Sequence, residues 1–276
     1  MTDVFSFSEG DSPLLVSIPH DGRHLAPGQA DRMTQVARAL PDTDWHVRKL
    51  YEFAADLDAS VIAANYSRYV VDLNRATDGL ALYEDQASSG LFPDKTFAGK
   101  DIYNSGETVS SQEQQQRISA YWRPYHERIA TTLVKLRQKH GYALLWDAHS
   151  IAGEVPALFK GVLPDLSFGT NDGSSCGAGI VASLMHSAEE SDYSVVLNER
   201  FRGGFITRQY GAPGGGIHAV QLELSQRNYM DEKTLSYQDD RAVKLADSIR
   251  NLMQAFLQAG KESLDTVTND YVEDRA

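Results

Sequence analysis

The stretch "WDAHS" (146–150) places Asp147 and His149 two residues apart at the end of the apolar run "YALLW". A second histidine, His20, follows the apolar run "LLVSIP" (14–19), and Glu223 lies within or at the end of "HAVQLEL" (218–224). Two histidines with one or two carboxylates, delivered by different strand ends, are the composition of an open catalytic zinc site. Three protein ligands then leave a fourth position for water.

Each of these residues also has an ordinary explanation. A single histidine near a strand end is more often structural than a metal ligand. Glu223 could be an exposed strand residue, because Gln221, Glu223 and Ser225 alternate on one face. A glutamate inside an apolar strand is costly to bury unless it is paired or lies beside a metal. We therefore favour a functional role for Glu223.

Short apolar runs predict the buried strands, and three-to-four-residue apolar spacing predicts the helices between them. The expected strands are 14–18, 60–65, 68–73, 142–146, 193–198 and 218–224. The clearest helix is 111–139, where Ser110 and Glu113 fit a capping box. Further helices are expected near 45–58, 177–188 and 236–259.

Alternating strands and helices predict an α/β fold: a three-layer sandwich with a mostly parallel central sheet. Ligands of such sheets bind outside the carboxyl ends of the strands. His20, Asn74, Arg75, His149 and Glu223 all follow or end predicted strands. We therefore expect them at one edge of the sheet.

We expect one domain over residues 1–276. The turn-rich segment 89–107 reads as a loop insertion that resembles a lid, and the charged residues from about 265 onward are expected to fray.

The overall composition excludes several classes of partner. A net charge of -12 repels nucleic acid phosphates and anionic lipids. No apolar window approaches the length of a membrane helix, the N-terminus does not resemble a signal peptide, and a single cysteine, Cys176, cannot form an internal disulfide. We expect a cytoplasmic protein that binds neither nucleic acid nor membrane; the sequence does not set its oligomeric state. An anionic substrate would need local arginines.

The segment "DTDWH" (42–46) precedes the predicted helix 45–58, so Asp42, Thr43 or Asp44 could cap that helix. Two aspartates are more than a cap needs. One of them can therefore point into the site.

The chain resembles the N-formylglutamate amidohydrolase (N-formylglutamate deformylase) family through an ordered set of segments. These are "SIPHDGRHL", "DTDWHVRKLYEFA", "YVVDLNR", "WDAHSI", "LPDLSFGTNDGSSC" and "ERFRGGFITRQYGAPGGGIHAVQLELSQRNYMDE". The match runs from about residue 12 to 255, and the block from Arg202 to Asp231 is its most specific part.

The resemblance implies hydrolysis of N-formyl-L-glutamate to formate and L-glutamate in histidine degradation. It also implies a fold similar to zinc-dependent exopeptidases and amidases, with Zn2+ or another divalent transition metal as cofactor. Carried onto this sequence, it makes His20, His149 and Asp44 the metal ligands. Asp42 and Asp21 lie close in sequence and remain alternatives to Asp44.

Glu223 matches the place where such hydrolases keep a general base. The metal would lower the pKa of its water, Glu223 would accept the proton, and the hydroxide would attack the formyl carbon. Glu223 would then deliver the proton to the leaving amine.

The implied substrate is a small anionic N-acyl amino acid with two carboxylates, which guanidinium groups recognise. Arg75, with Asn74 beside it, is the first choice for this contact, followed by Arg208, Arg23 and Tyr210. We expect Arg68 and Arg202 to be structural or exposed to solvent. Two alternatives stay open: a zinc deacylase for another N-acyl amino acid, and a non-catalytic relative that binds a metal or an amino acid.

Overall fold

The computed structural model describes residues 3–78 and 89–273 and contains a seven-stranded sheet. The strand order is β1-β3-β2-β4-β7-β5-β6. The strands are β1 (Phe5–Ser8), β2 (Leu14–Ile18), β3 (Ser60–Ala64), β4 (Ala143–Ile151), β5 (Leu166–Gly169), β6 (Val195–Leu197) and β7 (Ile217–Ser225). A separate pair, β8 (Met230–Asp231) and β9 (Ser236–Tyr237), forms a small antiparallel ladder.

The centre of the sheet is parallel. Strands β3, β2, β4 and β7 pair in parallel, as do β5 and β6. Only β1 against β3 and β5 against β7 are antiparallel. The predicted α/β fold with a mostly parallel sheet is confirmed, and the carboxyl ends of β3, β2, β4 and β7 share one edge.

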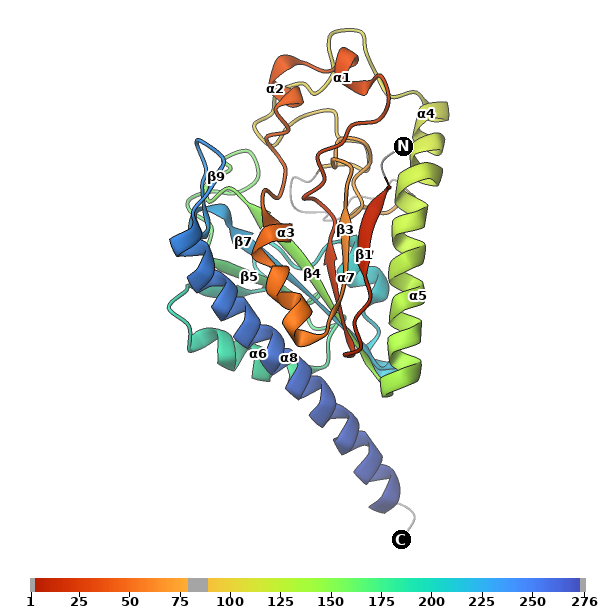
Figure 1. Cartoon of the computed structure of the whole chain (residues 1–276), viewed down its shortest axis with the longest axis vertical. Coiled ribbons are helices and arrows are strands. Elements are labelled where there is room, and N and C mark those ends of the chain that lie inside the picture. The colour runs from red at the N-terminus through yellow and green to blue at the C-terminus, as the bar shows by residue number, and fades with distance from the viewer. Residues whose placement is uncertain (1–2, 79–88, 274–276) are drawn as a thin grey trace.

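Helices cover both faces of the sheet, which gives three layers (Figure 1). Helices α3, α6 and α8 pack on one face, and α5 and α7 on the other. The helices are α1 (Gln29–Arg32), α2 (Gln35–Arg38), α3 (Val47–Leu50), α4 (Ser111–Arg117), α5 (Arg123–His140), α6 (Ala178–Glu189), α7 (Phe205–Tyr210) and α8 (Asp239–Glu273).

Strand alternation divides the apolar side chains between these two faces. Leu144 and Trp146 of β4 point to the cluster under α6 and α8, while Ala143 and Leu145 point to the cluster under α5. Every residue of β4 is buried, which explains the continuous apolar run that predicted this strand.

The predicted helix 111–139 is present but contains a π-helical turn at Ile118–Trp122, between α4 and α5. Ser110 caps it as predicted by accepting a hydrogen bond from the Glu113 backbone at 3.2 Å. The predicted helix 45–58 is split into α3 and a 3-10 helix at Glu52–Leu57.

The predicted strand 68–73 is wrong. This segment forms turns and irregular backbone, although Val70, Val71 and Leu73 are buried as the apolar pattern required. Its carbonyls accept hydrogen bonds from helix side chains, such as Arg117 to Val70 at 3.0 Å. Burial alone therefore produced a strand-like pattern without a strand.

Four strands were not predicted: β1 and β5 of the seven-stranded sheet, and the two-residue strands β8 and β9. β1 and β5 each have four residues and lie at or near the edges of the sheet. At the other end of the chain, α8 continues to Glu273, through the region from about 265 in which we expected fraying. The segment 89–107 consists of turns, bends and isolated bridges.

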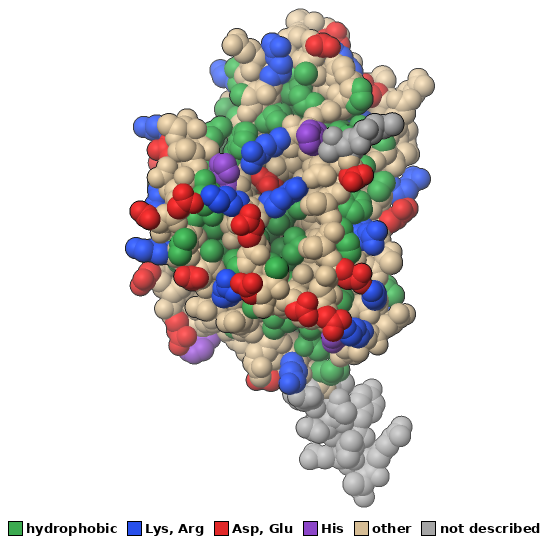
Figure 2. Space-filling model, in the orientation of Figure 1, with side chains coloured by type: hydrophobic (Ala, Val, Ile, Leu, Met, Phe, Trp, Pro, Cys, Tyr) green, Lys and Arg blue, Asp and Glu red, His purple; other side chains and the backbone are tan. Residues whose placement is uncertain are grey.

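Among the described residues, no helix is both long and apolar enough to cross a bilayer. Figure 2 shows acidic and basic side chains interspersed over one face of the molecule.

Candidate metal centre and active-site pocket

One face of the sheet changes from apolar to polar along the strands. On the α5 side, β4 presents Ala143 and Leu145 and then Asp147 and His149. The neighbouring β7 presents Gln221 and Glu223, which pair in register with Asp147 and His149. Because residues two apart in a strand share a face, the spacing in "DAH" and "QLE" places these four side chains together at the carboxyl edge.

His20 reaches the same edge from the neighbouring strand β2. That strand ends at Ile18, and Pro19, which lacks a backbone N–H, stands between it and His20. The carbonyl of His20 accepts a hydrogen bond from the Asp44 backbone at 3.1 Å. This bond holds the "DTDWH" segment against the end of β2.

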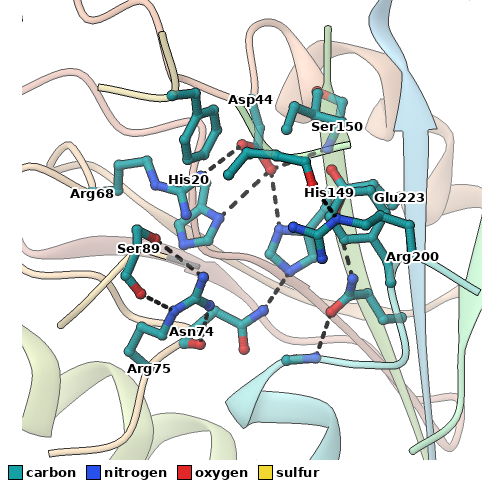
Figure 3. A pocket seen from close by; sticks show the side chains of 16 residues that line it. His20, Asp44, Arg68, Asn74, Arg75, Ser89, His149, Ser150, Arg200 and Glu223 are labelled. Atoms are coloured by element: carbon teal, nitrogen blue, oxygen red, sulfur yellow. Dashed lines mark hydrogen bonds and ion pairs between the residues drawn. The ribbon is translucent and has the colours of Figure 1, made fainter. Parts of the chain in front are cut away.

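The carboxylate of Asp44 lies between the two histidines. Its Oδ2 is 3.1 Å from Nδ1 of His149 and 3.7 Å from Nδ1 of His20, and the two rings are 4.9 Å apart between centroids (Figure 3). One ligand atom from each of the three residues lies within 4.8 Å of the others, and all three residues are buried. The group could hold a metal ion.

Each histidine turns its other ring nitrogen to a second carboxylate. Nε2 of His20 is 2.8 Å from Asp72, and Nε2 of His149 is 3.0 Å from Asp147. Such carboxylates fix the ring orientation and the tautomer that leaves Nδ1 free for a metal. Asp147, two residues before His149 in β4, thus places its carboxylate beside the His149 imidazole, whose Nε2 also lies 2.9 Å from the Asn74 amide nitrogen.

Asp72 was missed by the sequence reasoning. The signal was available, because "YVVDLNR" buries an aspartate among apolar residues, and buried carboxylates need partners. Asp72 is fully buried and also pairs with Arg68 at 2.7 Å. Arg68 is thus structural, as expected, but it also lines the pocket.

Burial and charge act in opposite directions on these groups. Burial raises the pKa of Asp44, but the hydrogen bond with His149 and the nearby His20 imidazole outweigh it and lower the pKa. Burial likewise opposes ionisation of Asp72, yet Arg68 and His20 hold its pKa well below the ordinary value. Both carboxylates therefore stay ionised near neutral pH.

The alternatives to Asp44 are engaged elsewhere. Asp42 accepts hydrogen bonds from the Tyr69 hydroxyl at 2.7 Å and the Phe97 backbone at 2.8 Å. Asp21 accepts one from the His46 backbone at 3.1 Å. The geometry brings only Asp44, of the three aspartates, between the two histidines.

Glu223 stands beside His149 in the next strand, and only 7% of its surface is exposed. Burial raises its pKa to about 8, and nearby Asp44 adds to the shift while His149 opposes it. Its Oε2 lies 3.5 Å from the Gln221 amide. A buried carboxylate with a raised pKa, next to a histidine that could bind a metal, is suited to proton transfer.

These residues line a pocket that also contains two further arginines, Arg75 and Arg200. Arg75 lies on the side of His20 and Arg200 on the side of His149 and Glu223 (Figure 3). Nε of Arg75 donates to the Ser89 carbonyl at 2.7 Å, and Nε of Arg200 donates to the Leu158 carbonyl at 3.0 Å. Ser89 and Phe97 of the predicted insertion 89–107 also form part of the wall.

Three predicted substrate contacts lie elsewhere. Arg23, Arg208 and Tyr210 do not line the pocket. Arg23 pairs with Asp21 and packs over Trp45, Arg208 donates to the Gly203 carbonyl, and Tyr210 hydrogen-bonds to His126. These three residues lie several positions before or after the ends of the strands, so their closeness in sequence to the strand ends did not place them in the pocket.

Asn74 is in the pocket, but its amide is engaged with the site itself. Its Nδ2 lies 2.9 Å from Nε2 of His149 and 3.2 Å from Asp147, and its Oδ1 accepts from the Ile206 backbone at 2.8 Å.

Arg200 was not predicted from the sequence, because "NERFR" (198–202) follows the short edge strand β6 and has no distinguishing pattern.

A family model described as N-formylglutamate amidohydrolase matches residues 12–230 of the chain. The chain belongs to the N-formylglutamate amidohydrolase family. It is 48% identical over 264 residues to the N-formylglutamate deformylase of Pseudomonas aeruginosa, covering 95% of this chain and 99% of that protein. It is 47% identical over 264 residues to that of Pseudomonas putida, covering 95% and 98%.

A crystal structure of an N-formylglutamate amidohydrolase from Ralstonia eutropha JMP134 has the same fold. The TM-score is 0.76 at 22% identity, and the match covers 98% of this chain and 100% of that one. A gene product from Agrobacterium tumefaciens matches with a TM-score of 0.72 at 18% identity, covering 94% and 96%. The two likenesses support the fold of this member of the N-formylglutamate amidohydrolase family.

Proposed function

We propose that this protein hydrolyses N-formyl-L-glutamate to formate and L-glutamate in a metal-dependent reaction. Two relatives that share nearly half of its residues over almost their whole length are N-formylglutamate deformylases. The observation that carries the proposal is the buried group of His20, Asp44 and His149 beside Glu223. It supplies the groups that hydrolysis of an amide needs.

The donor set fits a divalent transition metal, and we propose Zn2+. Two imidazole Nδ1 atoms and one carboxylate are typical of catalytic zinc, and each histidine has an orienting carboxylate behind it. When bound, such an ion polarises a carbonyl and lowers the pKa of water. His20, Asp44 and His149 would hold it.

Glu223 is the proposed general base and acid. Its carboxylate takes a proton from the attacking water and returns it to the amine of glutamate as the C–N bond breaks. An amine must leave protonated, because an amide anion is a poor leaving group. A buried site beside His149 suits both transfers, since few solvent molecules compete for the proton.

The substrate carries two carboxylates, and two arginines besides Arg68 line the pocket, Arg75 and Arg200. Arg68 is ion-paired with Asp72, whereas the contacts described for Arg75 and Arg200 include backbone carbonyls and, for Arg75, a serine hydroxyl. We assign one substrate carboxylate to each of these two arginines. This assignment replaces Arg23, Arg208 and Tyr210.

The first test is release of formate from N-formyl-L-glutamate by the purified protein. We expect a chelator to abolish release and added Zn2+ to restore it. Side-by-side assays with N-acetyl- and N-succinyl-glutamate separate deformylation from a broader deacylase activity. If no acyl group is released from any of these substrates with any metal, the protein is better explained as a non-catalytic relative that binds a metal or an amino acid.

A further inference from the structure

The irregular segment 69–75 brings Asn74 and Arg75 into the pocket wall and Asp72 against His20, but it belongs to no sheet. Three side chains of a single continuous helical stretch hold its backbone carbonyls instead. Arg117 donates to Val70 at 3.0 Å and to Tyr69 at 3.3 Å, His126 donates to Leu73 at 2.8 Å, and the Trp122 indole donates to Arg75 at 2.9 Å.

These three donors share one face of the helix only because of the π-helical turn. Arg117 and Trp122 are five residues apart, which in a regular α-helix leaves side chains about 140° apart around the axis, at about 100° per residue. In the turn at Ile118–Trp122, the Arg123 backbone bonds to the Ile118 carbonyl, an i to i+5 bond. Trp122 is thereby brought round toward Arg117, and His126 follows one α-helical turn later.

Pro124 gives a chemical reason for the turn at this place. A proline cannot donate to the carbonyl four residues earlier, and its ring crowds that carbonyl. The π-helical turn directly precedes Pro124 and accommodates the missing bond. Such turns are frequent at functional sites, where they re-aim side chains.

We propose that Trp122 is a positioning residue for Arg75, and that the π-helical turn sets the pocket's selectivity for a carboxylate on the substrate. The indole fixes the backbone of Arg75 at its carbonyl, while Ser89 fixes the guanidinium through its carbonyl at 2.7 Å and its hydroxyl at 3.1 Å. The main chain and the charged end of Arg75 are thus both held. This inference rests on the proposed function, and it assigns the side-chain carboxylate of the substrate to Arg75.

A merely structural role for Trp122 would affect every substrate alike. The discriminating readout is therefore the ratio of kcat/KM for N-formyl-glutamate to kcat/KM for N-formyl-glutamine, which has nearly the same shape without the side-chain charge. Trp122→Phe keeps an aromatic ring and removes the N–H donor. Tyr121→Phe is the matched control. It alters the neighbouring aromatic residue, whose ring contacts Tyr66, and leaves the Trp122 donor to Arg75 in place.

We expect Trp122→Phe to lower this ratio about fivefold through a higher KM for N-formyl-glutamate, the effect of losing one hydrogen bond. Metal content and the kcat for N-formyl-glutamine should not change. In an Arg75→Ala background the same substitution should have no further effect on the ratio, because the group being positioned is gone. Trp122→His retains a ring N–H and should recover part of the ratio; it also serves if Trp122→Phe does not fold.

An equal loss for both substrates, or an equal loss with and without Arg75, would overturn the proposal. If Arg75→Ala itself leaves the ratio unchanged while the wild-type protein releases formate, the positioning proposal falls and the proposed function stands. If the wild-type protein releases no formate from either substrate, the proposed function falls and this inference falls with it.

Discussion

The carboxylate of Asp147 lies 3.0 Å from Nε2 of His149, two residues along strand β4. Asp72 makes the equivalent contact with His20 at 2.8 Å, from an unrelated segment of the chain. Replacing either carboxylate by an amide changes the group that orients the imidazole. We expect Asp147→Asn and Asp72→Asn each to weaken metal binding by about 10- to 100-fold.

Competition with a chromophoric chelator measures this affinity. Asp56→Asn is the control, because Asp56 is exposed and pairs with Arg250 at the surface. Unchanged affinity in both buried variants would remove the two carboxylates from the metal centre.

Removal of a proposed ligand should have a larger effect. His149→Ala should lose bound metal and formate release together, since two ligands seldom retain a catalytic ion. Metal analysis by mass spectrometry and the activity assay test this on the same sample. His186→Ala provides the control, because His186 is 78% exposed; a His149→Ala protein that keeps its metal would contradict the ligand assignment.

Glu223→Gln should separate metal binding from turnover. The amide preserves size but cannot accept the proton, so we expect kcat to fall about 10²- to 10⁴-fold with metal content unchanged. Glu199→Gln, at an exposed position, controls for the loss of one negative charge. Full activity in Glu223→Gln would exclude it as the general base.

Arginine variants test which guanidinium groups meet the substrate. Arg75→Ala and Arg200→Ala should each lower kcat/KM about 10- to 100-fold, mainly through KM, as expected for loss of a charged hydrogen bond. Arg23→Ala and Arg208→Ala are matched controls, because neither residue lines the pocket. Loss of activity in Arg23→Ala and Arg208→Ala, with no loss in Arg200→Ala, would favour the lower-ranked contacts predicted from the sequence.

Metal binding should depend on pH with a definite sign. Burial lowers the pKa of His149, but Asp147 and Asp44 together hold it well above 6.5 in the metal-free protein. The imidazole must lose this proton to bind a metal, so affinity should rise with pH, by about tenfold per unit for one proton, until the pH exceeds that pKa. Calorimetry in buffers of different ionisation enthalpy measures the released proton; binding without proton release would contradict this.

The sequence predicted most of the architecture because buried strands leave a strong local signal. β2, β3, β4, β6 and β7 were all expected, and four of the site residues, His20, Asp44, His149 and Glu223, follow from strand ends or from the family resemblance. Local patterns carry this information because each strand must be apolar to be buried.

What the sequence could not supply depends on contacts between distant segments. Arg200 reaches the pocket from beyond an edge strand, and no local pattern marks its role. The segment 69–75 is buried without pairing, so its apolar pattern predicted a strand that is not there. The sequence likewise could not decide between Asp42 and Asp44 as the ligand. The deciding contact is a hydrogen bond to the Asp42 carboxylate from the hydroxyl of Tyr69, 27 residues away.

The position of β7 in the sheet has a consequence for the order of assembly. β7 is the last strand of the sheet in the chain, yet it lies between β4 and β5, which precede it. During synthesis, β4 therefore exposes one unpaired edge, and β5 and β6 cannot join the sheet, until the ribosome has released residue 225. All three proposed metal ligands precede Glu223 in the chain, so the nascent chain holds the proposed metal-binding residues before it acquires the proposed general base.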